Sequence, residues 1–211
     1  MQTTEETVQK QAMRKAFLLK RKGVAPIYNS DFLKKENCVI GFLTQLLQSI
    51  SQDNGKDFSI GAYRSLNGEV PLKGLFSTLP YPCSFPKVQD GGLHFYSADK
   101  EALHTTNLQN KKYWVKSNLG VWEPQCSKES LTPKVLLIPG VAFDKNFMRL
   151  GFGGGFYDKF LKNYKGIKIG ISFSDYVLEE PLPSENHDVA MDFLVTDKCI
   201  LQKVNSLKIK E

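Results

Sequence analysis

A glycine-rich segment in the last third of the chain constrains the fold most. Four glycines lie within the five residues from Gly151 to Gly155, between a strand-like run over residues 134–144 and a helix-like run that begins at Phe156. Glycine lets the backbone approach an anion closely, and a helix N-terminus presents unpaired N–H groups with partial positive charge. The segment therefore predicts an anion site where a buried strand passes into a helix.

The residues that flank the glycines favour a phosphate as the anion. Arg149 supplies several donors for phosphate oxygens, and Asp158 supplies a hard oxygen ligand suited to magnesium. The alternative is a glycine turn with a purely structural role. A Walker A loop would end in Gly-Lys-Ser or Gly-Lys-Thr, whereas Phe156 and Tyr157 follow the last glycine here. A dinucleotide fingerprint would lie early in the chain and need an acidic residue about twenty positions on, where this chain has Lys168.

Periodicity predicts alternating strands and helices in the rest of the core. Apolar runs rich in branched and aromatic residues indicate strands, and apolar residues at helical spacing indicate helices. Strands are expected near residues 58–63, 83–88, 93–97, 135–138, 168–172 and 193–195, and helices over 70–79 and 156–164. This order predicts an α/β three-layer sandwich, with a mostly parallel sheet and helices on both faces. The fold is expected to be Rossmann-like without the dinucleotide fingerprint, and its ligands should collect at the carboxyl ends of the strands.

Two helices should precede this core. The first is expected over residues 3–22 with Thr3 or Thr4 as its cap, and the second over residues 30–49 with Ser30 or Asp31 as its cap. The apolar stripe of the first helix is modest and consists of Val8, Ala12, Met13, Ala16, Phe17 and Leu19. A length of 211 residues suits a single domain over residues 1–211, in which residues 1–50 pack as helices onto the α/β core.

Composition argues against several classes of protein. The sequence contains no run of about eighteen apolar residues, so no membrane span is predicted. The net charge of +6 leaves a nucleic-acid-binding module as an alternative, but no motif that reads DNA or RNA accompanies the basic residues. The four cysteines are scattered and form no Cys-x-x-Cys pair: Cys38, Cys83, Cys126 and Cys199. A zinc site or a disulfide framework is therefore not expected, and we expect a cytoplasmic protein with reduced thiols.

The two runs over residues 137–144 and 149–158 together resemble the signature of the 5-formyltetrahydrofolate cyclo-ligase family, also called methenyltetrahydrofolate synthetases. The resemblance implies an ATP- and Mg²⁺-dependent cyclisation of 5-formyltetrahydrofolate to 5,10-methenyltetrahydrofolate with release of ADP and phosphate. This chain departs from the family pattern at Phe156, where tyrosine is usual, and at Pro71, where an acidic residue is common. Matching pieces in the same order extend over most of the chain: Lys10 and Arg14, Glu69, Pro86-Lys87, residues 120–124, and His187-Asp188-x-x-x-Asp192.

The family pattern also implies roles for individual residues. ATP would be held by Lys10, Arg14 and the loop formed by Arg149, Leu150, Gly151, Phe152, Gly153, Gly154, Gly155, Phe156 and Tyr157. Magnesium would be held by Asp158 and Asp192. The folate would be held by Glu69, Tyr157, Phe156 and Trp114, and catalysis would rest on Arg149, Tyr157 and Asp158. The expected partners are therefore two small molecules, with no nucleic acid and no membrane, and the expected state is a monomer. A folate- or nucleotide-binding protein that has lost the chemistry is the remaining alternative.

Overall fold

The structure is a computed structural model that describes residues 5–23, 29–54, 58–66, 68–76, 78–98, 102–103, 112–118, 120–125 and 130–204. Its helices are α1 (Glu5–Gly23), α2 (Ser30–Asn54), α3 (Lys73–Phe76), α5 (Phe156–Leu161) and the 3₁₀ turn η2 (Ser174–Tyr176). Its strands are β1 (Ile60–Gly61), β2 (Cys83–Gln89), β3 (Gly92–Ser97), β4 (Trp114–Lys116), β5 (Trp122–Pro124), β6 (Ser130–Leu131), β7 (Val135–Pro139), β8 (Ala142–Asp144), β9 (Arg149–Leu150), β10 (Ile167–Ile171), β11 (Val177–Leu178), β12 (Phe193–Val195) and β13 (Ile200–Gln202).

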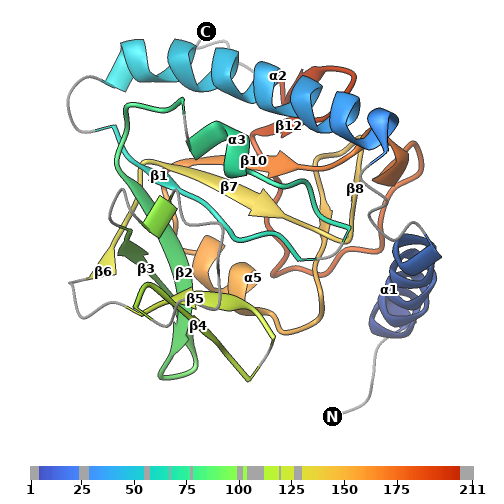
Figure 1. The fold of residues 1–211 in the computed structure, drawn as a ribbon. Helices are drawn as coiled ribbons and strands as arrows, with labels where there is room; N and C mark the ends of the chain where they lie inside the picture. Colours follow the sequence, from blue (N-terminus) through green and yellow to red (C-terminus); the bar gives the residue numbers. More distant parts are fainter. Residues whose placement is uncertain are drawn as a thin grey trace, which may run out of the picture.

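An eight-stranded sheet forms the centre of the molecule, in the order β13-β12-β10-β7-β1-β2-β3-β6 (Figure 1). Its inner strands are parallel, because β1 pairs in parallel with β2 and β7, and β10 pairs in parallel with β7 and β12. Antiparallel pairs add β13 at one edge and β3 and β6 at the other. The predicted α/β class with a mostly parallel sheet is confirmed.

Helices cover both faces of this sheet, because strand β7 carries apolar side chains on both of its faces. Successive residues of a strand point to opposite faces. Val135 and Leu137 join the apolar cluster that contains residues of α2, whereas Leu136 and Ile138 join the cluster that contains residues of α5. All four side chains are fully buried. Figure 1 accordingly shows α2 along one face of the sheet and α5 on the other.

Helix α1 lies at the edge of the sheet toward which the arrowheads of β7 and β10 point (Figure 1). Met13, Phe17 and Leu18 pack there on a small apolar cluster that includes Val141 and Leu150. The apolar stripe predicted for this helix is partly wrong. Two of its predicted members, Val8 and Leu19, are 54% and 58% exposed, while the basic Lys10 and Arg21 are buried. Helix α1 therefore docks through a mixed apolar and basic face.

Several predicted boundaries also need correction. Helix α2 continues to Asn54, and its cap is Asn29 rather than Ser30 or Asp31, because Asn29 Oδ1 accepts a hydrogen bond from the backbone N–H of Phe32 at 2.8 Å. The run over residues 134–144 forms two strands, β7 and β8, rather than one. Between them the carbonyls of Gly140 and Val141 accept hydrogen bonds from the side chain of Arg21 at 2.7 and 2.8 Å, so they are not available to a sheet ladder. The helix predicted over 70–79 is reduced to α3.

Other predictions concern residues outside the described part of the chain. Thr3 and Thr4, the expected caps of the first helix, lie there, as does Cys126. Within the described residues Cys38, Cys83 and Cys199 are free thiols. Among those same residues, no helix has both the length and the apolar character needed to cross a membrane.

Candidate active site

The glycine-rich loop opens onto a pocket of about 340 Å³ at the carboxyl ends of the central strands. Segments far apart in the sequence meet there, which is the position that a parallel sheet provides for its ligands. The pocket contains most of the loop predicted from the sequence together with the predicted folate residue. Its lining residues are Tyr63, Arg64, Leu66, Glu69, Pro86, Val88, Leu93, Val121, Glu123, Pro139, Arg149 and residues 151–158.

The conformation of the loop explains why glycine is needed at particular positions. Gly153 has φ +103° and Gly155 has φ +65°, a left-handed region in which a side chain is strained. A Cβ atom at Gly151 would lie only 2.7 Å from Arg149 Nη1, and one at Gly153 would lie 3.3 Å from Arg14 Cζ. The glycines therefore let two guanidinium groups approach the backbone. Because α5 has only six residues, the charge of this anion site rests on those two groups more than on a helix dipole.

Arg149 forms an ion pair with Asp158 across the two ends of the glycine loop. Its Nη2 donates to Asp158 Oδ1 at 2.6 Å, and its Nη1 donates to the carbonyl of Pro139 at 3.4 Å. The Arg149 side chain is 5% exposed and that of Asp158 is 21% exposed. Arg149 Nε is buried and has no hydrogen-bond partner within the described residues. Such an orphaned donor in a pocket is a position that a ligand oxygen would satisfy.

Glu69 is a buried carboxyl group that lines the same pocket. Its Oε2 accepts a hydrogen bond from the backbone N–H of Leu66 at 2.7 Å. Burial raises the pKa of Glu69 to about 7, although the Leu66 N–H and the charges of Arg21 and Arg149 oppose the rise. Glu69 therefore changes its protonation state near neutral pH, and in its ionised form it offers a strong acceptor to polar N–H groups.

Tyr157 brings a second unsatisfied polar atom to the pocket. Its hydroxyl is buried, and no hydrogen-bond partner for it exists in the described part of the chain. Burial raises the pKa of Tyr157 above its ordinary value, while the charge of Arg149 lowers it. The Arg149 guanidinium lies 5.3 Å from the centre of the Tyr157 ring, within the range of a cation–π contact. A neutral hydroxyl donor thus stands beside the guanidinium that faces the loop.

Helix α1 supplies three basic side chains to the loops around this pocket. Arg14 Nε donates to the carbonyl of Gly151 at 2.7 Å, which fixes the guanidinium against the glycine loop. Arg21 bridges the carbonyls of Gly140 and Val141 just after β7. Arg14 and Arg21 thus each hold a backbone segment next to a pocket-lining residue as well as carrying charge.

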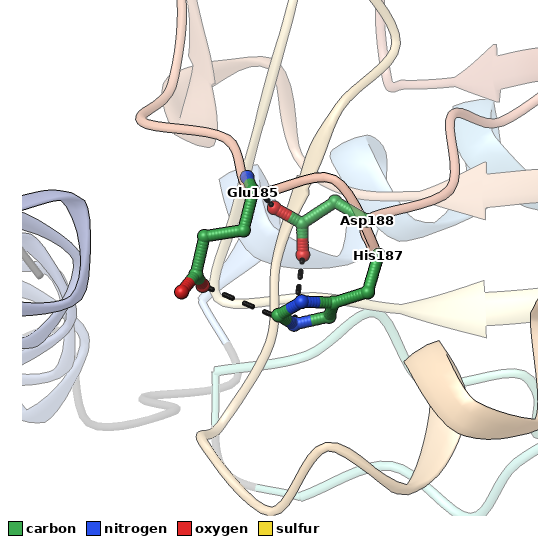
Figure 2. Close-up of side chains that lie close together, drawn as sticks. All are labelled: Glu185, His187 and Asp188. Carbon is green, nitrogen blue, oxygen red and sulfur yellow. Dashed lines mark hydrogen bonds and ion pairs between the residues drawn. The ribbon is translucent and has the colours of Figure 1, made fainter. Parts of the chain in front are cut away.

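Lys10 is the third of these residues, and two carboxylates hold it. Its Nζ lies 2.7 Å from Glu185 Oε2 and 2.5 Å from Asp188 Oδ2. Burial lowers the pKa of Lys10, but the hydrogen bonds and charges of Asp188 and Glu185 outweigh burial and raise the pKa overall. His187 adjoins the same two carboxylates at 3.9 Å from each, and Asp188 also accepts the backbone N–H of Glu185 (Figure 2). The Lys10 ammonium group thus occupies the place that a cation would take in this cluster.

The structure does not bring the two predicted metal ligands together. Asp192 precedes β12, and its Oδ2 accepts from the backbone N–H and the Nζ of Lys168 near the start of β10, both at 2.8 Å. These are the amino ends of parallel strands, whereas Asp158 lies in the pocket at the carboxyl ends. The charge of Asp192 contributes to the raised pKa of Tyr164, beyond the last turn of α5. The predicted pairing of Asp158 with Asp192 around one ion is therefore corrected: Asp192 secures the start of β12.

Trp114 is also misplaced by the sequence prediction. It is fully buried rather than exposed to the pocket, and its Nε1 donates to the carbonyl of Ala102 at 3.2 Å. Phe156 does line the pocket, as predicted. The sequence prediction assigned no role to two charged residues that line the pocket, Arg64 and Glu123. The position of Arg64 directly after the strand predicted over residues 58–63 was the available signal, since residues at strand ends were expected to meet at the site.

Comparison with known proteins identifies the family of the chain. The model of the 5-formyltetrahydrofolate cyclo-ligase family matches residues 6–197. The chain belongs to this family. It is 31% identical over 160 residues to the 5-formyltetrahydrofolate cyclo-ligase of Haemophilus influenzae, a match that covers 71% of this chain and 80% of that relative. It is 37% identical over 145 residues to the Escherichia coli K12 protein of the same name, with 65% and 77% covered.

Solved structures support the cyclo-ligase fold. The 5,10-methenyltetrahydrofolate synthetase of Aquifex aeolicus superposes with a TM-score of 0.72 at 28% identity, and the match covers 96% of each chain. A synthetase from Mycoplasma pneumoniae superposes with a TM-score of 0.63 at 22% identity, over 89% of this chain and 98% of that one, which supports the fold alone. The roles of single residues in this cyclo-ligase family member stay predictions, argued below from its own geometry.

Proposed function

We propose that this family member is an ATP- and Mg²⁺-dependent ligase that closes 5-formyltetrahydrofolate to 5,10-methenyltetrahydrofolate and releases ADP and phosphate. One observation carries the proposal. The phosphate-type loop with Arg149 and Asp158 lines the same pocket as the buried Glu69 and as Tyr157, whose hydroxyl has no hydrogen-bond partner among the described residues. A nucleotide phosphate and a folate head group can therefore meet in one cavity.

The reaction explains why both ligands must meet. The oxygen of an N-formyl group is a poor leaving group, because amide resonance strengthens its bond to carbon. In the proposed first step the formyl oxygen attacks the γ-phosphorus of ATP, the bond to ADP breaks, and an imidate phosphate forms at N5. N10 then attacks the imidate carbon and loses its proton, and the C–O bond breaks to release phosphate. Such phosphoryl transfer requires alignment and charge neutralisation above all.

The guanidinium groups of Arg14 and Arg149 would perform the charge neutralisation. Both are fixed before any ligand binds, Arg14 by the carbonyl of Gly151 and Arg149 by Asp158 and the carbonyl of Pro139. Fixed donors stabilise developing charge without reorganising at the moment of reaction. The buried Nε of Arg149, which has no partner among the described residues, is the donor that this proposal assigns to a phosphate oxygen.

The carboxylate of Asp158 is suited to hold a magnesium ion in this pocket. One of its oxygens accepts from Arg149, and its side chain remains partly exposed on the pocket wall. Its second oxygen is suited to a hard cation, which in nucleotide sites is commonly held by one or two carboxylates together with phosphates. We therefore assign magnesium to Asp158 alone. The ion would neutralise the phosphates, and Asp158 would set its position relative to Arg149.

The folate end is assigned to Glu69 and Tyr157. A carboxylate with a pKa near 7 can accept hydrogen bonds from the polar N–H groups of the pterin, and the Tyr157 hydroxyl can donate to the formyl oxygen. Binding at these groups would satisfy polar atoms whose burial is otherwise costly.

The proposal is tested by mixing the protein with 5-formyltetrahydrofolate, ATP and Mg²⁺ and following the near-ultraviolet absorbance of the methenyl product. Product, ADP and phosphate should form in equal amounts, and a chelator should abolish all three. Ligand binding without any product would instead make the chain a non-catalytic folate- or nucleotide-binding protein. Product formed equally well without ATP would refute the phosphoryl-transfer step.

A further inference from the structure

Arg64 is a charged pocket residue for which the proposed reaction has no role so far. It follows β1 by three positions and lines the same pocket as the glycine loop. Its ring contacts lie on the side of β2 and β4, whereas Arg149 reaches the end of β7. The pocket therefore has a cationic group on each side, and only the one near β7 belongs to the phosphate loop.

The Arg64 guanidinium is held in a fixed orientation. It lies 4.2 Å from the ring centre of Trp114 and 5.4 Å from that of Phe85. Those two rings meet edge to face at 5.0 Å, and Trp114 is fully buried behind the guanidinium. Arg64 Nη2 also donates to the carbonyl of Ala102 at 2.7 Å. Stacking and this hydrogen bond leave the remaining donors little freedom to turn elsewhere.

Those remaining donors have no protein acceptor in the described part of the chain. Arg64 Nε is buried without a hydrogen-bond partner, and no carboxylate of those residues pairs with the guanidinium. Glu123 lines the same pocket, but its Oε1 accepts instead from the backbone N–H of Val88 at 3.3 Å. Burial lowers the pKa of Arg64 to about 10, so the group stays charged at neutral pH while lacking much of its hydration. An oxygen acceptor supplied by a ligand would offset that loss.

Only one part of the proposed ligands is left to supply such an acceptor. The phosphates of ATP are assigned to the loop near β7, and the pterin and formyl groups of the folate are assigned to Glu69 and Tyr157. The remaining oxygens belong to the benzoylglutamate arm, namely an amide carbonyl and two carboxylates. A guanidinium stacked on an aromatic ring suits this arm, because its plane can cover the benzoyl ring and its edge can donate to the oxygens.

We propose that Arg64 binds an oxygen of the benzoylglutamate arm and thereby selects substrates that carry this arm. The inference rests on the proposed cyclo-ligase function and adds a specificity-determining residue to it. Arg64 is a binding residue in this role, since the phosphoryl transfer and the ring closure occur at the other side of the pocket. Its contribution should therefore fall on the KM for the folate.

The test compares two substrates and three proteins. The substrates are 5-formyltetrahydrofolate and a truncated analogue that keeps the formylated pterin, N10 and the phenyl ring but lacks the carbonyl and the glutamate. The proteins are the native chain, Arg64→Leu and Lys73→Leu, the last of which removes an exposed cation of α3 outside the pocket. Arg64→Leu should raise the KM for the full substrate roughly ten- to hundredfold, the loss of one hydrogen bond to a charged group. The KM for the analogue and for ATP should stay within about twofold.

The outcomes separate this inference from the proposed function and from misfolding. An equal rise in KM for both substrates, or no rise for either, would overturn the role of Arg64. If the native protein forms no product from either substrate, the proposed function itself fails. Thermal unfolding of each variant checks the fold, and Arg64→Lys, which keeps the charge, should recover part of the discrimination between the substrates if the donor matters. Equilibrium binding of the two substrates without ATP should show the same selectivity, independently of turnover.

Discussion

Arg149 Nη2 donates to Asp158 Oδ1 at 2.6 Å, so that an ion pair closes the glycine loop across the eight residues that separate the two side chains. The pair places a cation and a carboxylate at fixed positions on one wall of the pocket. In the proposed reaction the cation faces the phosphates and the carboxylate faces magnesium, and each holds the other in place. Predictions for the two residues are therefore linked.

Replacing Arg149 with Ala should lower kcat by roughly two to three orders of magnitude, the typical effect of removing one fixed donor to developing charge. Asp158→Asn should also lower kcat strongly, because it removes the negative charge that the proposed magnesium ion requires. Asp158→Asn keeps an oxygen that can accept from Arg149 and so separates metal binding from loop closure. The measurement is product absorbance at saturating ATP, with circular dichroism to confirm a native fold. Near-normal turnover in either variant would remove that residue from its assigned role.

Gly153→Ala should destabilise the fold and weaken ATP binding. The φ of +103° strains an alanine by roughly 1–2 kcal/mol, and the new Cβ would push against the Arg14 guanidinium. Gly41→Ala is the matched control, because Gly41 lies in α2 and, apart from its own helix backbone, no atom of the described residues lies within 4 Å of the added Cβ; alanine should stabilise that helix by about 1 kcal/mol. Chemical denaturation of the two variants should give shifts of opposite sign; a stabilised Gly153→Ala variant would show that the loop geometry is wrong.

The stability of the native protein should fall as the pH rises from about 4.5 to above 7 through the effect of Glu69. The folded-state pKa of Glu69 is about 7, against an ordinary value of 4.5, so its contribution is fully present below 4.5 and is lost as pH rises through 7. The full span corresponds to about 3 kcal/mol. Glu69→Gln removes this dependence and keeps an acceptor for Leu66. Its unfolding free energy, relative to the native protein, should therefore increase from pH 5 to pH 8; an equal difference at both pH values would contradict the raised pKa.

Lys10→Met should destabilise the protein, because Glu185 and Asp188 would lose the cation between them. A double-mutant cycle of Lys10→Met with Asp188→Asn should give a coupling free energy of roughly 1–3 kcal/mol. The matched control is Lys35 with Asp175, a more exposed pair at 2.8 Å whose coupling should lie below about 1 kcal/mol. Similar couplings for the two pairs would mean that burial adds nothing at Lys10. The KM for ATP, measured on the same variant, tests the family-implied contact with phosphate.

The sequence predicted the class of fold and the glycine loop well, because both depend on local patterns. The buried run before the loop and the helical spacing after it place Arg149 and Asp158 at a strand-to-helix junction, and the structure agrees. Local patterns do not specify what a side chain meets from a distant segment. Lys10 reads as one basic residue among several, and only the folded chain brings Glu185 and Asp188 to it.

Long-range packing also explains the two misplaced predictions. Trp114 has the chemistry of a stacking residue, but the Arg64 guanidinium lies against its ring. Arg64 therefore lines the pocket in place of Trp114. Asp192 has the chemistry of a metal ligand, but its position just before β12 puts it at the amino ends of the strands, beside Lys168. Resemblance to a family predicts which residue types are present. The arrangement of the sheet decides at which end of a strand each of them lies.

The docking of α1 has a consequence for how the chain folds during synthesis. This helix is synthesised before the segments that it contacts, and the groups bound by its basic residues lie 119 to 178 positions later, from Gly140 to Asp188. Contacts of such long sequence separation form late, because the intervening chain must be ordered first. Helix α1 therefore lacks these contacts until the chain has been made as far as Gly140, and it gains the last of them only with Asp188. The contact of Arg14 with Gly151 forms only after the glycine loop has been made, so that ATP should be bound only by chains that extend past this loop.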